Sequence, residues 1–593
     1  MKRISLQILT ILFGIVSGCT APDEASPFTA VDWENDLPKV EFSGEWYYFE
    51  KIGPIDKKEI LAYCKQKYGA KWKKRFSEDL VEVLSGMGHT PDIDIQLTLR
   101  NGNEVKVLTG KFTEKNRRQV WHYNDEKRKE IELNALRSRK FSKDQVKNDI
   151  SFLQKNIEEF YSYAELNNFN YPSAFERLIQ KLGDTTSYVV MAIEIQKILS
   201  QFGDGHTRVS GVSRILDPGY LPFSVASYCN RVICIDQSEN KLLNKDYPYL
   251  ESINGVSTDS LLHEANKLVA KGSAQFKIYR SVARLVFIRY LLSQFNISIE
   301  STLQVVLSND IGQLTELHLP VSNRRFKLSS RERSVSVPDN IGYLRIKQMS
   351  SSKKKLSEIE DKMDSFRFTD GLIIDIRDNP GGSRKILKFL APYFIPDESK
   401  PIIVNAAVFR TNTKAKNNQG YLSNRSLYPF HSEKFNEQDR AAINKFSKNF
   451  KPAWDFPREN FSQWHYFLLG SEKKAAYKYD KPVVVLINAN CYSAADVFAA
   501  SFKELPNVTL IGTSTGGGSG RTKSYVLPNS GIKIGLSTMA SFQPNGQLFD
   551  GNGVAPDIEV DETISDILRT EDSQLDMALE LINETTLTNA KTP

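Results

Sequence analysis

The chain has 593 residues, of which 40% are hydrophobic and 25% are charged. These proportions are those of a globular protein and exclude an intrinsically disordered chain, a polytopic membrane protein, a collagen and a coiled coil. The 78 basic and 71 acidic residues leave a net charge of +7. Because this charge is spread over a long chain, it gives no argument for nucleic acid or for an anionic membrane as a partner.

The N-terminus has the pattern of a bacterial lipoprotein precursor. Two basic residues precede an apolar stretch over residues 8–16, which is too short to span a membrane comfortably. Residues 16–19, Val-Ser-Gly-Cys, resemble a lipobox, in which the cysteine is diacylated after cleavage. The resemblance implies a signal peptide over residues 1–18 and a lipid anchor on Cys19. A simple secretory signal with an incidental cysteine is the alternative.

Residues 19–45 are expected to tether the folded part to the bilayer. Residues 20–38 are rich in Ala, Pro, Asp and Glu and have no apolar period. Thr20 follows the cysteine, whereas an aspartate at that position is associated with retention in the inner membrane of Gram-negative bacteria. We therefore expect a protein of the bacterial cell envelope, anchored on the periplasmic face of the outer membrane.

Four further cysteines are scattered through the chain and predict neither a disulfide framework nor a zinc site. Cys229 and Cys234 flank a possible hairpin turn, so a bridge between them stays open. The other two cysteines are Cys64 and Cys491.

Residues 46–138 are expected to form a small α+β module without an evident chemical role. Residues 57–68 have a basic, helix-like pattern, and residues 93–108 alternate in polarity. Asn101-Gly102 interrupts the alternation, as the turn of a hairpin does.

Residues 139–212 are expected to be helical and to carry a candidate catalytic histidine. Ser142, followed by Gln145, predicts the capped start of a helix. A second apolar helix pattern ends at Gly203. The tetrapeptide Asp-Gly-His-Thr, residues 204–207, therefore lies on a tight loop, which is a rigid mount for His206.

Residues 213–335 read as a β-rich domain. Four strand patterns surround a helical span over residues 261–295. Residues 250–256 resemble the strand and turn of PDZ-type peptide-binding domains, although an ordinary strand and turn has the same pattern. The expected strands are residues 223–228, 232–236, 250–253 and 302–307.

Residues 336–570 alternate strands and helices, which predicts a parallel sheet covered by helices. Ligands bind such sheets where strands end, and an unusual loop follows each of three apolar strands. Residues 411–479 are long and polar and are expected to be an insertion at the cleft edge or a lid. Residues 571–593 are expected to form a C-terminal helix and tail. The apolar strands are residues 371–376, 482–488 and 508–512.

Two of these loops hold candidate chemistry. The backbone amides of Gly381 and Gly382, before a helix, suit an oxyanion hole, and a plain turn that needs glycine is equally consistent. Ser493 begins a helix, with Asp496 three residues later. This spacing is that of a capping box, but Ser493 is also a candidate nucleophile beside the amide of Ala494.

Three motifs in order resemble peptidase family S41, the C-terminal processing and tricorn-core proteases. They are Gly-Leu-Ile-Ile-Asp-Ile-Arg-Asp-Asn-Pro-Gly-Gly at 371–382, the Ser493 segment, and Gly-Val-Ala-Pro-Asp-Ile at 553–558. The resemblance runs over residues 141–567. It implies an α/β fold with a ClpP/crotonase-like catalytic core, a PDZ-like domain, serine peptidase activity and no cofactor or metal.

The family has two catalytic arrangements. In the processing proteases a lysine lies 25 residues after the serine, but that position here is Gly518 and the nearest lysine beyond it is Lys523. The tricorn-like branch uses a histidine in Asp-Gly-His-Thr, which His206 matches. Its acidic partner, usually glutamate, corresponds to Asp550. The resemblance implies that Ser493 attacks, that His206 moves the proton and that Asp550 orients His206.

The leading hypothesis is an envelope-anchored serine endopeptidase that acts on polypeptides and captures them by strand addition. A catalytically silent peptide-binding lipoprotein and a serine–lysine protease using Lys523 are the alternatives. Acyl-group chemistry with coenzyme A, as in crotonase relatives, is a third, although it needs no serine–histidine pair. Cys491 is a weak candidate nucleophile. The oligomeric state is not predicted.

Overall fold

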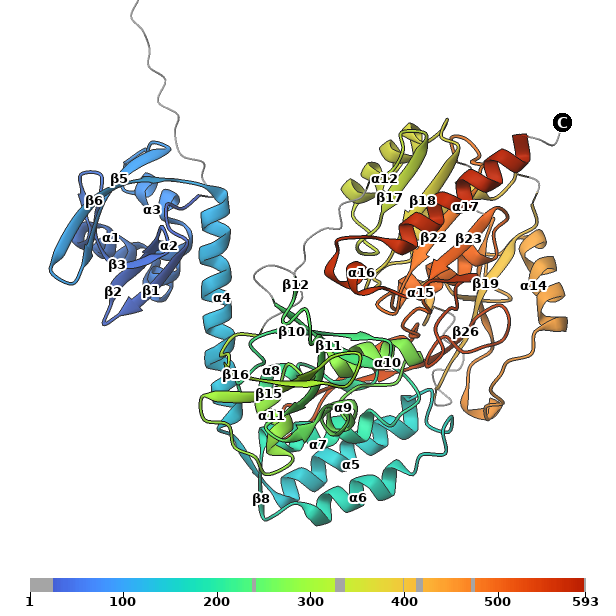
Figure 1. The fold of residues 1–593 in the computed structure, drawn as a ribbon, viewed down its shortest axis with the longest axis horizontal. Helices are drawn as coiled ribbons and strands as arrows, with labels where there is room; N and C mark the ends of the chain where they lie inside the picture. Colours follow the sequence, from blue (N-terminus) through green and yellow to red (C-terminus); the bar gives the residue numbers. More distant parts are fainter. Residues whose placement is uncertain are drawn as a thin grey trace, which may run out of the picture. The chain divides into compact units, whose positions relative to one another are not determined.

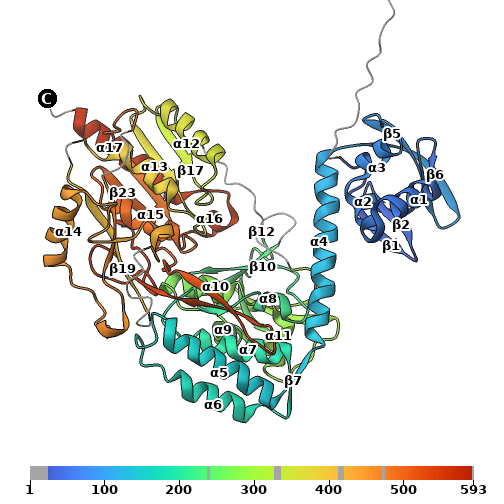
Figure 2. The same ribbon diagram turned by 180° about the vertical axis from the view of Figure 1, so that it is seen from behind.

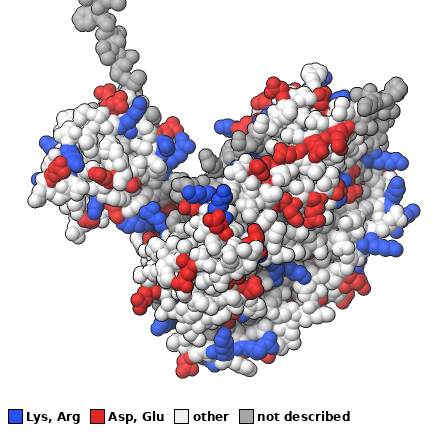
Figure 3. All heavy atoms as spheres, in the orientation of Figure 1, with Lys and Arg blue, Asp and Glu red and all other residues white. Residues whose placement is uncertain are grey.

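In a computed structural model, the chain divides into two compact units, residues 1–136 and 137–593 (Figures 1 and 2). The predicted signal peptide and Cys19 lie outside the described residues. Within the described part of the chain, no helix is long and apolar enough to cross a membrane. On the face drawn in Figure 3, basic and acidic side chains are interspersed. The structure describes residues 25–236, 241–325, 336–397, 399–411, 420–470 and 475–590.

The first unit is built on an antiparallel sheet of order β1-β2-β3-β5-β6, with β4 paired to β3. One face of the sheet buries its apolar side chains against α1, α2 and α3 in a common core. The elements are β1 (Ala30–Glu34), β2 (Leu37–Phe42), β3 (Glu45–Ile52), β4 (Ile55–Asp56), α1 (Lys57–Tyr68), α2 (Trp72–Glu78), α3 (Leu80–Gly86), β5 (Asp94–Asn101), β6 (Glu104–Lys111) and α4 (Glu114–Arg137).

The helix predicted over residues 57–68 is confirmed as α1. The hairpin is also present, but its turn lies one residue later than predicted, because Asn101 pairs with Glu104. The expectation of a tether up to residue 45 is wrong for β1 and β2. Their Val31 and Val40 are buried in the core, and this short apolar alternation is masked by the polar residues around it.

In the second unit, the segment before the catalytic core begins with three helices. Ser142 caps α5, and Gln145 completes the predicted capping box. Helix α7 is almost entirely buried and leads through a short loop into β9. The elements are β7 (Lys140–Ser142), α5 (Lys143–Phe160), α6 (Tyr171–Lys181), β8 (Thr185–Ser187), α7 (Tyr188–Leu199), β9 (Arg208–Val209) and α8 (Val212–Ile215).

An antiparallel sheet of order β10-β11-β13-β15-β16 follows, with β12 and β14 paired to its inner strands. The predicted helical span is divided into α9, α10 and α11. The elements are β10 (Ser224–Tyr228), β11 (Arg231–Asp236), β12 (Lys241–Leu242), β13 (Tyr249–Ile253), β14 (Val256–Ser257), α9 (Thr258–Asn266), α10 (Ala274–Val282), α11 (Ile288–Ser293), β15 (Thr302–Ser308) and β16 (Leu314–Pro320).

The disulfide left open by the sequence is absent, and both cysteines are free. Tyr228 pairs with Arg231, so Cys229 and the next residue form the hairpin turn. Cys229 is exposed at this turn, whereas Cys234 lies opposite Val225 and is buried. The two-residue turn therefore separates the two thiols.

The catalytic core is a parallel sheet of order β17-β18-β22-β23-β27 between two helical layers (Figure 2). One face packs on α17, and the other packs on α13 and α15. The three predicted apolar strands are confirmed as β18, β22 and β23. The elements are β17 (Ile341–Arg345), α12 (Lys353–Ser365), β18 (Gly371–Asp375), α13 (Lys385–Phe394), β22 (Val483–Ile487), α15 (Ala494–Lys503), β23 (Val508–Gly512), β27 (Ile558–Glu559), α16 (Ile564–Leu568) and α17 (Ser573–Ala590).

A second sheet, of order β20-β21-β19-β26, covers the far side of α15. Strand β21 comes from the expected insertion and pairs with β19, so the expectation of a peripheral lid is wrong for this strand. Its side chains are all buried, and α14 packs on the outer face. The elements are β19 (Ile402–Phe409), β20 (Tyr428–Pro429), α14 (Glu437–Asn449), β21 (His465–Leu469) and β26 (Met539–Phe542). A separate three-stranded sheet has the order β24-β25-β9, with β24 (Thr522–Val526) and β25 (Lys533–Ser537).

Arg377 joins the loop after β18 to the start of α17. The side chain is fully buried, and its guanidinium donates hydrogen bonds to Asp375, Asp572 and Gln574. Burial raises the pKa of Asp375, but Arg377 and Arg345 outweigh this effect and hold the pKa at about 2. The loop that leads to Gly381 is therefore fixed by a charge cluster inside the protein.

We expect Arg377→Ala to lower the free energy of unfolding by about 3–5 kcal/mol, because it removes the buried cation that pairs with Asp375 and Asp572. Urea denaturation followed by circular dichroism measures this change. Arg367→Ala, which removes an exposed arginine, is the control and should cost no more than about 0.5 kcal/mol. A loss below about 1 kcal/mol for Arg377→Ala contradicts the role assigned to the cluster.

Candidate active site

Three loops meet at the carboxyl edge of the parallel sheet. The amide of Asp378, after β18, donates to Asn488 Oδ1 at 2.9 Å, and Asn488 and Asn490, after β22, both donate to Asp378 Oδ1 at 3.0 Å. The loop after β23 joins through the amide of Gly516, which donates to the carbonyl of Cys491 at 2.7 Å. These bonds bring the candidate oxyanion loop beside Ser493, as the strand order predicts.

Ser493 has a strained backbone and no capping role. Its φ of 61° and ψ of −112° lie where non-glycine residues are rare, and conformations of this kind cost about 1–3 kcal/mol. Its side chain accepts no capping hydrogen bond from α15. The capping box is absent, because Asp496 instead accepts bonds from Thr515 Oγ1 at 2.5 Å and from two glycine amides. A sharp strand-to-helix turn of this kind exposes a nucleophile.

The three expected oxyanion donors are not equivalent. Gly381 packs against Ser493, but its amide already donates to Asn379 Oδ1 at 2.9 Å. Gly381 can therefore donate to an oxyanion only if its amide releases or shares the bond to Asn379. Gly382 and Ala494 form no amide hydrogen bond within the described residues, and Ala494 is the first residue of α15. Their amides, with the positive end of the helix dipole, are the remaining donors.

His206 lies on a loop that Asp204 holds in place. Asp204 Oδ1 accepts hydrogen bonds from the amides of His206 at 2.8 Å and Thr207 at 2.9 Å. It also accepts from the Ser537 hydroxyl, on β25. Strand β9 then pairs with β25, so the loop is closed at both ends. The rigid loop predicted from the sequence is present, and hydrogen bonds to the Asp204 side chain stabilise it.

Asp550 faces the δ nitrogen of His206. Its Oδ1 lies 3.8 Å from His206 Nδ1, while its Oδ2 accepts a hydrogen bond from the Tyr163 hydroxyl at 2.7 Å. Asp550 is buried, and burial raises the pKa of its carboxyl, an effect that the nearby His206 opposes. Asp550 Oδ1 and His206 Nδ1 are near each other but too far apart for a hydrogen bond. This gap is consistent with an aspartate, whose side chain is one methylene shorter than that of a glutamate.

Tyr492 connects the histidine loop with the rest of the site. Its ring stacks on His206 at 4.9 Å and, on its opposite side, on Phe276 at 5.2 Å. Its hydroxyl lies 3.4 Å from His206 Nδ1. A Cβ at Gly205 or Gly518 would collide with this hydroxyl. The glycine in the Asp-Gly-His-Thr loop therefore makes room for Tyr492.

Two competing residues are placed elsewhere. Lys523 is exposed on β24, and its ammonium lies 4.2 Å from the centre of the Phe160 ring. Cys491 is buried, its thiol donates to the carbonyl of Ile376 at 3.0 Å, and burial raises the pKa of the thiol. Neither is arranged as a nucleophile or base. No hydrogen bond joins Ser493 and His206 within the described residues.

One group of side chains in the described part of the chain could hold a metal ion. The ligand atoms of Asp204, His206 and Asp550 lie within 4.8 Å of one another. Asp204 Oδ2 and Asp550 Oδ1 are both buried without a hydrogen-bond partner. An ion at this position would bind His206 Nδ1, the nitrogen that faces Asp550.

Sequence reasoning missed the aromatic side chains of the site. Tyr163, Phe276 and Tyr492 come from three distant segments, and each looks like an ordinary core residue. The position of Tyr492, directly before the candidate nucleophile, was the available signal. The Gly516, Gly518 and Gly520 run was a second signal, because such a run allows close packing.

We expect the Asp496 carboxyl to make stability depend on pH. Burial raises its pKa from an ordinary 3.8 to about 7, so between these values the folded state binds more protons than the unfolded state. The contribution of this group to the free energy of unfolding therefore falls as pH rises from about 4 to 7. Asp496→Asn should flatten this fall in urea denaturation. An unchanged slope contradicts the assignment.

Three comparisons bear on the family. Residues 340–560 match peptidase family S41. An uncharacterised protein of Chlamydia muridarum is 37% identical over 92 residues, which is 15% of this chain and 15% of that protein. A carboxy-terminal-processing protease of Bartonella bacilliformis is 34% identical over 86 residues, 14% of this chain and 19% of that protein. The chain thus spans less than a fifth of the length of these two relatives.

A solved structure extends the likeness in fold. Mature CPAF in complex with lactacystin superposes with a TM-score of 0.53 at 16% identity, covering 75% of this chain and 99% of that one. At this identity the likeness shows the fold. This likeness confirms the predicted α/β fold, and the match over residues 340–560 confirms the predicted resemblance of that segment to peptidase family S41.

Proposed function

We propose that the protein is a serine endopeptidase that uses Ser493 as nucleophile, His206 as general base and Asp550 as orienting acid. The observation that carries the proposal is the backbone of Ser493, which is strained and does not cap its helix. A strained residue without a structural bond is typical of a site where geometry serves chemistry. The pair of His206 and Asp550 supports it.

The chemistry follows from these positions. His206 Nε2 accepts the proton of the Ser493 hydroxyl while Oγ attacks the peptide carbonyl. The amides of Gly382 and Ala494 donate to the oxyanion as the tetrahedral intermediate forms. His206 then gives its proton to the departing amine, which leaves an acyl-enzyme on Ser493. Water, deprotonated by His206, attacks the ester and releases the product.

To complete the relay, Ser493 Oγ must come within hydrogen-bond distance of His206 Nε2, and the carboxylate behind His206 must move closer. Asp550 Oδ1 must approach His206 Nδ1 from 3.8 Å to hydrogen-bond distance. Catalytic hydrogen bonds often tighten only when substrate binds. The bond of Asp550 to Tyr163 holds the carboxylate in place during this change.

The alternatives are less well supported by the same residues. A silent peptide-binding protein needs neither the strain at Ser493 nor a carboxylate behind His206. A base at Lys523 requires a lysine near Ser493, whereas Lys523 lies over the Phe160 ring on an exposed strand. Coenzyme A chemistry leaves the serine and the histidine without a role.

We expect the full-length protein to cleave an unfolded polypeptide such as casein. Ser493→Ala and His206→Ala should each lower kcat/KM by roughly a thousandfold or more, and Asp550→Asn should lower it as well, because each variant removes one part of the relay. Rates are measured by release of fluorescent fragments.

Lys523→Ala is the matched control and should retain activity within about threefold of the parent. If Lys523→Ala were inactive while His206→Ala cleaved casein, the serine would remain but the assigned base would be wrong. A parent that cleaves neither casein nor any peptide tested, while folded, favours the silent alternative.

We further propose that the protein is held in the cell envelope by a lipid on Cys19 and that the β-rich domain around β13 captures peptide substrates as an added strand. The lipobox pattern at residues 16–19 supports the first part, and the antiparallel sheet of that domain supports the second.

In a bacterial host, the wild-type protein should incorporate radiolabelled palmitate and sediment with membranes. Cys19→Ser should abolish both, because the serine hydroxyl is not a substrate for lipoprotein acylation. Thr20→Ser, at the next residue, is the control that should behave as wild type. Label in the Cys19→Ser variant refutes the anchor.

A further inference from the structure

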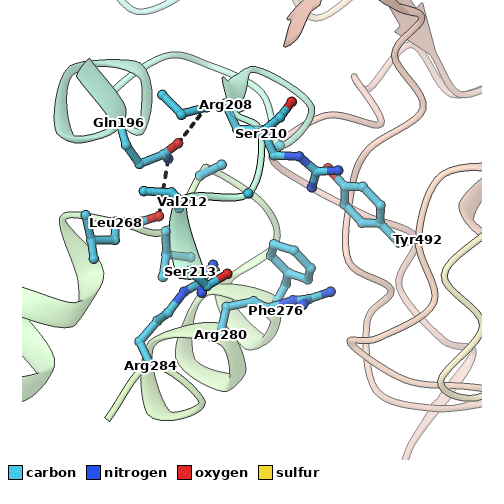
Figure 4. Close-up of a pocket in the computed structure, with 15 residues that line it drawn as sticks. Gln196, Arg208, Ser210, Val212, Ser213, Leu268, Phe276, Arg280, Arg284 and Tyr492 are labelled. Atoms are coloured by element: carbon cyan, nitrogen blue, oxygen red, sulfur yellow. Dashed lines mark hydrogen bonds between the residues drawn. The ribbon is translucent and has the colours of Figure 1, made fainter. Parts of the chain in front are cut away.

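A cavity of about 310 Å³ opens beside the catalytic loops (Figure 4). Gly205 and Tyr492 line one side, and they are the chain neighbours of His206 and Ser493. The opposite side is formed by α10 and by the segment just after β9. The cavity therefore borders the two residues that directly precede His206 and Ser493 in the chain.

The cavity is lined by three arginines and by no acidic residue. The arginines are Arg208, Arg280 and Arg284, and Figure 4 shows their side chains around the same space. None of the three forms an ion pair or a side-chain hydrogen bond with a described residue. Arg280 and Arg284 lie instead against the rings of Phe276 at 4.9 Å and Phe287 at 5.9 Å.

The like charges repel one another. Burial, together with the charges of the neighbouring Arg325, Arg280 and Arg208, lowers the pKa of Arg284 to about 10. The buried Arg377 of this unit has a carboxylate partner, Asp572, at 2.6 Å, whereas the buried Arg384 donates to Asn405 Oδ1. Arg208 and Arg280 are exposed and Arg284 is half-buried, so the three guanidinium groups are solvated and can bind an anionic ligand from solvent.

The cavity is linked to the catalytic histidine by a column of rings. The Arg280 guanidinium lies over Phe276, which stacks on Tyr492, which stacks on His206. An anion bound by Arg280 therefore has a fixed position relative to His206. Guanidinium groups bind carboxylates in a bidentate way, which adds orientation to attraction.

We propose that this arginine cavity is a subsite for a carboxylate of the peptide substrate, so that the enzyme selects acidic sequences near the cleaved bond. The inference rests on the proposed peptidase function for the nature of the ligand. The carboxylate comes from an Asp or Glu side chain or from the end of the peptide chain, and both present the same group to the arginines.

The test uses the full-length Ser493→Ala protein, which binds without cleaving, and fluorescent peptides in matched pairs. The reference bond is one that the wild type cleaves in casein or, if none is cleaved, the central bond of the peptide. A single Glu is placed in turn at each of the three positions on either side of this bond. Each Glu peptide is compared with the peptide that has Gln at the same position. Each peptide is made with a free and with an amidated C-terminus. Fluorescence polarisation gives the affinities.

We expect one carboxylate to tighten binding by about 10-fold or more, and Arg280→Ala and Arg284→Ala to remove that gain, as charge-assisted hydrogen bonds predict. Arg280→Lys should keep part of it. Arg214→Ala, an exposed arginine of α8 outside the cavity, should change nothing. A gain that follows Glu identifies a side-chain subsite, and one that follows the free C-terminus identifies a chain-end subsite.

Thermal unfolding separates ligand binding from a structural role. Because the arginines repel one another, Arg280→Ala should be at least as stable as its parent. Equal affinity for all four peptides of a set, at every position, overturns the proposal. A carboxylate preference that survives each of Arg208→Ala, Arg280→Ala and Arg284→Ala also overturns it. If casein is not cleaved but the preference is found, the peptidase function fails and the carboxylate site stands.

Discussion

The packing of Tyr492 is the contact on which the arrangement of the site depends. The residue directly precedes Ser493, and its ring lies between His206 on one side and Phe276 on the other. It thereby brings together three segments that are far apart in the chain: the loop before β9, helix α10 and the loop before α15. Glycines at positions 205 and 518 leave the space that the hydroxyl needs. This contact ties the loop of His206 directly to the loop of Ser493.

Buried charge is used in two different ways in the second unit. Around Arg377, each charge has an opposite partner, and the cluster holds the loop of the oxyanion donors against α17. Around Arg284, the charges have the same sign and lie open to a cavity. The first arrangement stabilises the fold. In the second, two of the three arginines are exposed to solvent, which is why we propose it as a binding surface.

The sequence predicted the parts of the site that are local in the chain. Apolar strands followed by glycine-containing loops predicted the carboxyl edge of the sheet, and the Asp-Gly-His-Thr motif predicted the loop of His206. Ser493 was ambiguous, because a capping box and a nucleophile share the same spacing, and only the backbone conformation separates them. The amide bond of Gly381 to Asn379 depends on the path of the loop, which spacing cannot show. The long segment before β22 was misread as a lid, because its buried strand β21 is short.

The partnership of Tyr492 with His206 and the arginine cavity were beyond sequence reasoning, since both join residues separated by large stretches of chain. The same holds for β1 and β2, whose few apolar residues are meaningful only against the sheet they join. Periodicity finds elements, whereas contacts between distant elements decide which residues share a site.

The most direct test of the account is to find which residue a serine-reactive phosphonate modifies in the folded, full-length protein. We predict a covalent adduct on Ser493, identified by mass spectrometry of the tryptic peptide, that forms far more slowly in His206→Ala. An adduct on another residue, or one that forms at the same rate without His206, would contradict the proposed active site.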